Sequence, residues 1–266
     1  MIEWQVIHDS LPAFASGLGV CLVLLVLSVG TGFVLSVPLA VARVSARRAL
    51  WVPVWTYTYV FRGTPLLVQL FLVYYGFAQF EAVRESPLWP LLREAWFCAW
   101  LAFALNTTAY TTEIFAGALR ATPHGEVEAA RAYGLSGFKL YTRILLPSAL
   151  RRALPQYSNE VVGMMHATAI VSTVTLVDVT RVARDVYANH LLPVEAFGTA
   201  AVIYFVLTFL LVGGFKLLEK RFLRHLQTER RPASAADTAT APAAAPAAAP
   251  AAAPAAAPAA APASAP

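Results

Sequence analysis

Five long stretches of this chain are almost free of charged residues, and each is long enough for a helix that crosses a bilayer, which needs about 20 apolar residues. Only 13% of all residues are charged and 58% are hydrophobic, a balance that argues against a soluble domain. The pattern predicts an all-α transmembrane fold with five spanning helices. The expected spans are residues 11–42, 51–80, 95–119, 153–178 and 196–217.

Lysine and arginine fall unevenly between the expected spans, which predicts an orientation in the membrane. Residues 43–48, 120–152 and 216–231 together hold 15 basic residues, whereas the loops on the other side hold four. We therefore expect the N-terminus outside and the C-terminus in the cytoplasm. The net charge of +5 is then a signal of topology, and nucleic acid is not an expected partner.

The sequence contains no obvious catalytic or cofactor motif. It lacks the Gly-x-x-x-x-Gly-Lys-Ser/Thr loop that would bind ATP, and no nucleophile triad or zinc cluster stands out, so we expect no metal, no cofactor and no enzyme activity. Cys21 and Cys98 lie far apart in apolar segments. Residues 1–231 form the expected transmembrane domain. Residues 232–266, rich in Ala and Pro, are expected to be a disordered tail.

The loop of residues 120–152 is far longer than a chain reversal needs. Glu126–Tyr133 reads as a short helix whose acidic residues suit its N-terminal end, and Gly134 fits a helix stop. Ser136 is positioned to cap a second short helix, which Pro147 is expected to limit. The loop is either an amphipathic connector on the membrane surface or an element that inserts into a partner.

The spacing of this loop resembles the coupling-loop signature of the membrane subunits of ABC importers, in which the loop docks into a cytoplasmic ATPase. The resemblance implies an ATPase-coupling role for seven residues: Glu128, Ala129, Ala130, Gly134, Ile144, Leu146 and Pro147. The chain itself would bind no ATP.

Further segments are similar to the polar amino-acid uptake branch of this family. They are residues 61–71, 109–118 and 159–160. Within that branch, residues 123–126 and 157–160 look most like the M-type subunits of histidine/lysine/arginine/ornithine permeases. The resemblance covers roughly residues 11–226, and the tail departs from it.

The resemblance implies a permease subunit of an ATP-driven importer in a bacterial inner membrane, forming half of a pore that opens alternately to each side. Its implied partners are an ABC ATPase dimer, a second permease subunit, either homologous or identical, a periplasmic amino-acid-binding protein and a polar, basic amino acid such as histidine, arginine, lysine or ornithine. Alternatives are a permease for another polar amino acid or an opine, and a self-contained channel or secondary carrier.

A polar helical face in the fourth expected span is a candidate substrate pathway, because ionisable groups inside a membrane are costly and need a partner or a function. The candidates are Asn159, Glu160, His166 and Thr168. We expect Glu160 to offset the charge of a cationic substrate. The alternative is a helix-packing face in which Glu160 pairs with an arginine such as Arg152 and His166 only packs.

Arg62 and Glu113 are the other isolated charges within expected spans. Residues 62–65 are expected to form a turn near the cytoplasmic face, which would place Arg62 at a similar depth to Glu113. The sequence therefore suggests an intramembrane ion pair between them, with stabilisation as its simplest role.

Overall fold

The computed structural model describes residues 3–222 of the chain, and within them every regular element is helical. The expected tail, residues 232–266, lies outside the described residues. The α-helices are α1 Trp4–Arg43, α2 Arg48–Gly63, α3 Leu66–Phe71, α4 Glu81–Arg84, α5 Trp89–Leu92, α6 Ala95–Arg120, α7 His124–Ala132, α8 Gly137–Leu140, α9 Leu146–Ala167, α10 Val179–His190 and α11 Pro193–Phe222. Two π-helical turns cover Leu72–Gly76 and Tyr141–Leu145, and two 3₁₀ turns cover Phe77–Gln79 and Thr168–Thr173.

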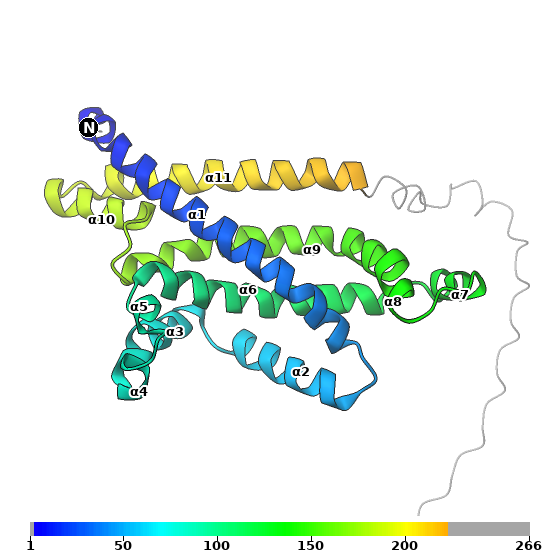
Figure 1. Cartoon of the computed structure of the whole chain (residues 1–266). Coiled ribbons are helices and arrows are strands. Elements are labelled where there is room, and N and C mark those ends of the chain that lie inside the picture. The colour runs from blue at the N-terminus through cyan, green and yellow to red at the C-terminus, as the bar shows by residue number, and fades with distance from the viewer. Residues whose placement is uncertain (1–2, 223–266) are drawn as a thin grey trace, which may run out of the picture. The chain divides into compact units, whose positions relative to one another are not determined.

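Helix α6 forms the centre of the bundle and packs against α1, α2, α3 and α9 (Figure 1). Its buried face combines Phe103 with small and hydroxyl-bearing residues such as Thr107 and Thr108. Small side chains allow helices in a membrane to approach closely. Gly32 of α1 is one such contact, because a Cβ atom at this position would lie 2.5 Å from Thr107 Cγ2.

Two helices of the described residues, α1 and α11, are long and apolar enough to cross a membrane by length and composition. A third candidate arises if α2 and the helical segment that follows it are counted as one broken span, bent by 103°. Helix α6 covers the third expected span, whereas α9 covers the fourth only as far as Ala167, and both helices have more polar sequences. Because α6 is largely enclosed by protein, its threonines and Asn106 need not face lipid.

The second expected span is broken rather than continuous. Pro65 cannot continue the hydrogen-bond ladder of α2, and Thr64 before it is extended, with φ −114° and ψ 140°. The break leaves the last carbonyl groups of α2 without helical partners. The side chain of Gln69 replaces the missing donors, because its Nε2 donates to Phe61 O at 2.8 Å and to Thr64 O at 3.0 Å.

The break lies beside the middle of α6, because Asn106 Nδ2 donates to Gln69 Oε1 at 3.1 Å. The expected turn near the cytoplasmic face is therefore corrected to a turn at mid-depth of the bundle. The physical reason for this position is the hydrogen bond between the side-chain amides of Asn106 and Gln69. It holds Gln69 where its amide can donate to the backbone carbonyl groups at the break.

Pro147 does not limit the second short helix of the polar loop. The chain is helical without interruption from Gly137 through Ala167, passing through the π turn Tyr141–Leu145. Leu146 N donates to Tyr141 O, five residues earlier, so the backbone hydrogen bonds of the π turn are already displaced from the α-helical pattern just before Pro147, which has no N–H group. Pro147 consequently stands in the first turn of α9, a position that tolerates proline.

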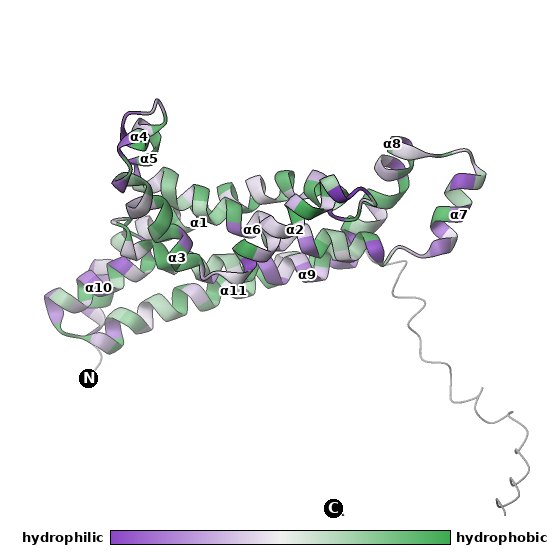
Figure 2. Cartoon of the chain, turned by 90° about the horizontal axis from the view of Figure 1, so that it is seen from below, coloured by the Kyte–Doolittle hydropathy of each residue, from purple (hydrophilic) through white to green (hydrophobic). Residues whose placement is uncertain are grey.

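The polar elements gather at opposite ends of the described bundle. Helices α7 and α8 lie at one end, with the C-terminal ends of α1, α6 and α11, and α10 lies at the other end (Figure 1). Coloured by hydropathy, the long helices between them are mostly apolar, whereas α7 and α10 carry many hydrophilic residues (Figure 2). This separation agrees with a bundle that crosses a membrane.

Candidate functional site

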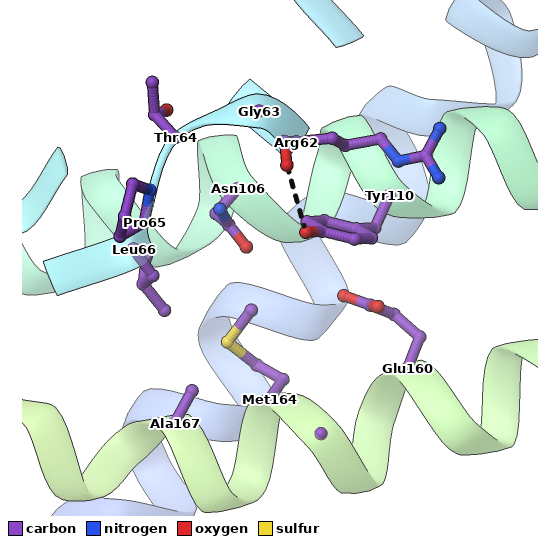
Figure 3. Close-up of a pocket in the computed structure, with 11 residues that line it drawn as sticks. Arg62, Gly63, Thr64, Pro65, Leu66, Asn106, Tyr110, Glu160, Met164 and Ala167 are labelled. Carbon is purple, nitrogen blue, oxygen red and sulfur yellow. Dashed lines mark hydrogen bonds between the residues drawn. The ribbon is translucent and has the colours of Figure 1, made fainter. Parts of the chain in front are cut away.

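A polar cavity of about 440 Å³ lies where the break between α2 and α3 faces α6 and α9. Figure 3 shows its side chains, with Tyr110 and Asn106 on α6 and Glu160 and Met164 on α9. Its lining residues are Arg62, Gly63, Thr64, Pro65, Leu66, Asn106, Tyr110, Glu160, Gly163, Met164 and Ala167. The broken helix thus presents polar groups to an open cavity on the side of the bundle where α2, α6 and α9 meet.

A second cavity of about 530 Å³ shares Arg62, Tyr110 and Glu160 with the first. It adds Glu113, Ile114, Gln156 and Asn159 to the lining. The shared residues therefore stand between two adjoining polar spaces.

Glu160 is held from α6 rather than by an arginine of its own helix. Its Oε1 accepts a hydrogen bond from Thr107 Oγ1 at 3.1 Å. The alternative partner, Arg152, instead pairs with Glu126 at 3.4 Å, so the alternative pairing of Glu160 with Arg152 is wrong. Glu160 makes no ion pair among the described side chains, which leaves most of its acceptor capacity open.

The remaining pathway candidates differ in their surroundings. Asn159 lines the second cavity. His166 lies outside the linings of both cavities, and its Nε2 is 3.1 Å from Thr208 Oγ1 of α11. Thr168 is fully buried, and its hydroxyl donates to Met165 O at 2.6 Å. Because α9 ends at Ala167, Thr168 no longer follows the helical face that begins at Asn159.

Glu113 pairs with Arg43 instead of Arg62. Arg43 Nε lies 2.6 Å from Glu113 Oε1, and both side chains are 16% exposed. Thr58 Oγ1 donates to the same oxygen at 2.7 Å. The suggested pair of Arg62 with Glu113 is therefore wrong in its basic partner. Helix α1 extends far enough for Arg43, in its last turn, to reach α6.

Arg62 lies over an aromatic ring. Its Cζ is 5.2 Å from the centroid of the Tyr110 ring, a cation–π geometry. The Tyr110 hydroxyl is 3.5 Å from Arg62 O (Figure 3). The ring thus holds both the side chain and the backbone at the end of α2.

Glu126 connects α7 of the polar loop to α9. It accepts hydrogen bonds from Ser148 Oγ at 2.8 Å and from Arg152 Nη1 at 3.4 Å. Arg152 Nη2 also donates to Thr122 Oγ1 at 2.7 Å. Because Ser148 and Arg152 belong to α9, these hydrogen bonds join α7 directly to that helix.

The tip of the polar loop presents apolar side chains to solvent. Tyr133 is 87% exposed and Phe138 is 83% exposed. Gly134 between them has φ +76°, a left-handed conformation that glycine adopts without strain. Exposed aromatic side chains on a fixed turn are typical of a protein-binding surface.

The seven predicted coupling residues divide by exposure. Glu128, Ala129 and Gly134 are exposed, whereas Ala130 is buried and packs inward. The other three are half-buried along the continuous helix that starts at Gly137: Ile144, Leu146 and Pro147. Glu128 and Ala129 therefore lie on α7 and Gly134 in the turn that follows it, whereas the half-buried members lie on the next helical segment.

Sequence reasoning missed several residues of these sites. Gln69 and Asn106 were polar residues within apolar stretches, and this is the signal that was available for them. Tyr110 lies in residues 109–118, which resemble the family, but it was not singled out there, and Phe138 carried no signal that distinguishes it from other aromatic residues. Within residues 3–222 no group of three or more His, Cys, Asp or Glu is placed to hold a metal ion.

An all-helical bundle with apolar spans, a polar cavity and a polar loop at one end is typical of a membrane transport subunit. The family described as "Binding-protein-dependent transport system inner membrane component" matches residues 32–224, and the chain belongs to this family. It is thus an inner-membrane permease component.

Known relatives agree with this assignment. The chain is 50% identical over 213 residues to the histidine/lysine/arginine/ornithine transport system permease protein HisM of Escherichia coli K12, covering 80% of this chain and 90% of that protein. It is 44% identical over 229 residues to the octopine transport system permease protein OccM of Rhizobium meliloti, covering 86% and 94%. The crystal structure of an amino acid ABC transporter with histidines matches with TM-score 0.74 and 31% identity, covering 83% of this chain and 99% of that chain.

Proposed function

We propose that this chain is the membrane half-pore of an ATP-driven importer for basic amino acids. The observation that carries the proposal is the polar cavity beside Glu160, a carboxylate with no ion-pair partner among the described residues. A basic amino acid would supply the missing positive charge. The similarity to the histidine/lysine/arginine/ornithine permease supports the same substrate class.

Asn159 and Glu160 are the residues that we assign to this pathway, because both line the second cavity and Glu160 also lines the first. His166 and Thr168 belong to the same proposal, although they line neither of the two cavities and would act indirectly. His166 would act through its contact with Thr208 of α11, and Thr168 through the packing of the turn after α9.

The proposed topology has five spans, with the N-terminus outside and the C-terminus in the cytoplasm. It counts α1, the broken segment from α2 to Gln79, α6, α9 with its 3₁₀ turn, and α11. The position of the polar loop at the basic end of the bundle supports this orientation.

The proposed partner of the polar loop is a cytoplasmic ATPase dimer. Glu128, Ala129 and Gly134 would contact it together with the exposed Tyr133 and Phe138. Closure of the ATPase would move α7, and the contact of Glu126 with Arg152 would pass that movement to α9, which carries Glu160. A second permease subunit would complete the pore, and an extracytoplasmic binding protein would deliver the substrate.

A second candidate substrate is an opine, because the chain is 44% identical to an octopine permease. Another polar amino acid is a further alternative within the same class. A self-contained channel or carrier is the alternative from a different class, and it predicts transport by the isolated chain without ATP.

The proposal is tested by uptake of radiolabelled arginine, lysine and histidine into cells that contain the whole importer. We expect Glu160→Gln to reduce uptake of all three, with Glu85→Gln, the same change at an exposed glutamate outside both cavities, as the control. Unchanged uptake in Glu160→Gln would contradict the charge role. Competition by unlabelled octopine that exceeds competition by arginine would favour the opine.

A further inference from the structure

Arg62 is an exposed charged residue beside the middle of α6 that the proposed pathway has not yet used. It stands in the last turn of α2, where the chain breaks beside α6. Among the described residues its guanidinium makes neither an ion pair nor a hydrogen bond, and its Cζ lies over the face of Tyr110 at 5.2 Å from the ring centroid. Arg62 lines both polar cavities, and its five N–H donors have no hydrogen-bond partner among the described residues.

An arginine at membrane depth without an anion is costly. The contact with Tyr110 offsets part of this cost but leaves the donors unused. The anion that fits a guanidinium best is a carboxylate, which accepts two parallel hydrogen bonds from it.

Glu160 presents the complementary charge to the same two cavities. Its carboxylate keeps one hydrogen bond, from Thr107, and is not paired with Arg62. Figure 3 shows the Tyr110 ring between the Arg62 side chain and the Glu160 carboxylate. The cavity therefore holds one open positive and one open negative group, kept apart by an aromatic ring.

We propose that Arg62 binds the α-carboxylate of the transported amino acid while Glu160 faces its cationic groups. An amino acid with a basic side chain carries these two kinds of charge at its two ends, and the aromatic ring of Tyr110 lies along its length. A cavity of about 440 Å³ falls in the usual range for small-molecule sites. This inference rests on the proposed import of basic amino acids and adds the group that recognises them as amino acids.

The test compares arginine with agmatine, which is arginine without its carboxylate. Binding of each radiolabelled compound is measured on the purified permease–ATPase complex with the binding protein left out. For the unaltered complex we expect arginine to bind roughly ten- to a hundred-fold more tightly than agmatine, the scale of a charge-assisted hydrogen-bond pair.

Arg62→Gln should weaken arginine binding by a similar factor and leave agmatine binding unchanged, so that the ratio of the two affinities approaches one. Arg62→Lys keeps the charge without the planar fork and should give an intermediate ratio. Arg48→Gln, at the exposed start of the same helix, is the matched control and should keep the ratio of the unaltered complex.

An equal loss of arginine and agmatine binding in Arg62→Gln would overturn the inference, because a structural defect affects both ligands. Arginine binding that is retained or tightened in Arg62→Gln would also overturn it. If ATP-driven uptake of basic amino acids persists in either case, only the inference is lost. Absence of that uptake in the unaltered importer would remove the proposed function itself.

Discussion

Arg43 Nε lies 2.6 Å from Glu113 Oε1 and ties the last turn of α1 to α6. Thr58 of α2 donates to the same carboxylate oxygen, so that the side chain of Glu113 joins α1, α2 and α6. These contacts lie in the half of α6 that precedes α7. The group is therefore placed to keep the base of the polar loop in position.

Replacing Glu113 by Gln should lower the free energy of unfolding by about 1.5–3 kcal/mol, the contribution of a hydrogen bond to a charged group. Both side chains of the pair are mostly shielded, which limits screening by solvent. The midpoint of thermal unfolding in detergent measures the effect. Arg48→Gln removes an exposed arginine as the control, and equal midpoints for the two variants would contradict the role of the pair.

Gln69→Leu should destabilise the break between α2 and α3. It leaves Phe61 O and Thr64 O without their amide donor, and each buried unsatisfied group costs about 1–3 kcal/mol. We expect a lower unfolding midpoint and less correctly assembled permease. Gln79→Leu changes an exposed glutamine nearby and should have little effect, so a similar loss in both variants would argue against this account.

Gly32→Ala should separate α1 from α6, because the added Cβ would lie 2.5 Å from Thr107 Cγ2 and 3.3 Å from Thr108 N. Overpacking of this kind costs about 1–3 kcal/mol. Arginine uptake should fall as well, since Thr107 also donates to Glu160. At Gly30 a Cβ meets open space, and Gly30→Ala should retain both stability and uptake. Equal behaviour of the two alanine variants would refute the close contact.

Arg152→Met should weaken the connection between α7 and α9 by removing its bonds to Glu126 and Thr122. We expect fewer arginine molecules transported for each ATP hydrolysed, with the ATPase still bound. Arg151→Met is the matched control, because Arg151 is the exposed neighbour. A double-mutant cycle with Glu126→Gln should show a coupling energy of about 0.5–3 kcal/mol, and additive effects would contradict a direct link.

The helical bundle was largely predictable because charge is so unevenly distributed along the chain. The third expected span, residues 95–119, agrees closely with α6, Ala95–Arg120. The position of the break in the second expected span was harder to predict from the sequence. Residues 63–65 predict a turn. The position of that turn along α6 depends on the hydrogen bond between Gln69 and Asn106, two residues that only the packed structure brings together.

The sequence was sufficient to predict which charged residues lie at the candidate site, but not which of them form ion pairs. Glu160 stood out as a rare charge, and it does line the polar cavities. The partner of Glu113 did not follow from depth, because Arg43 and Arg62 both reach the region and the exact end of α1 decides between them. Thr168 left the predicted face because α9 changes to a 3₁₀ turn after Ala167, which ends the 3.6-residue period.

The most direct test of the central proposal is uptake of radiolabelled arginine by proteoliposomes that contain the complete importer, with binding protein outside and ATP enclosed. We predict uptake that requires ATP and is lost in Gly134→Asp, which forces a side chain onto a residue with φ +76° in the coupling loop. Thermal unfolding would show that the variant is still folded. Arginine uptake without ATP, or full uptake by Gly134→Asp, would contradict the account.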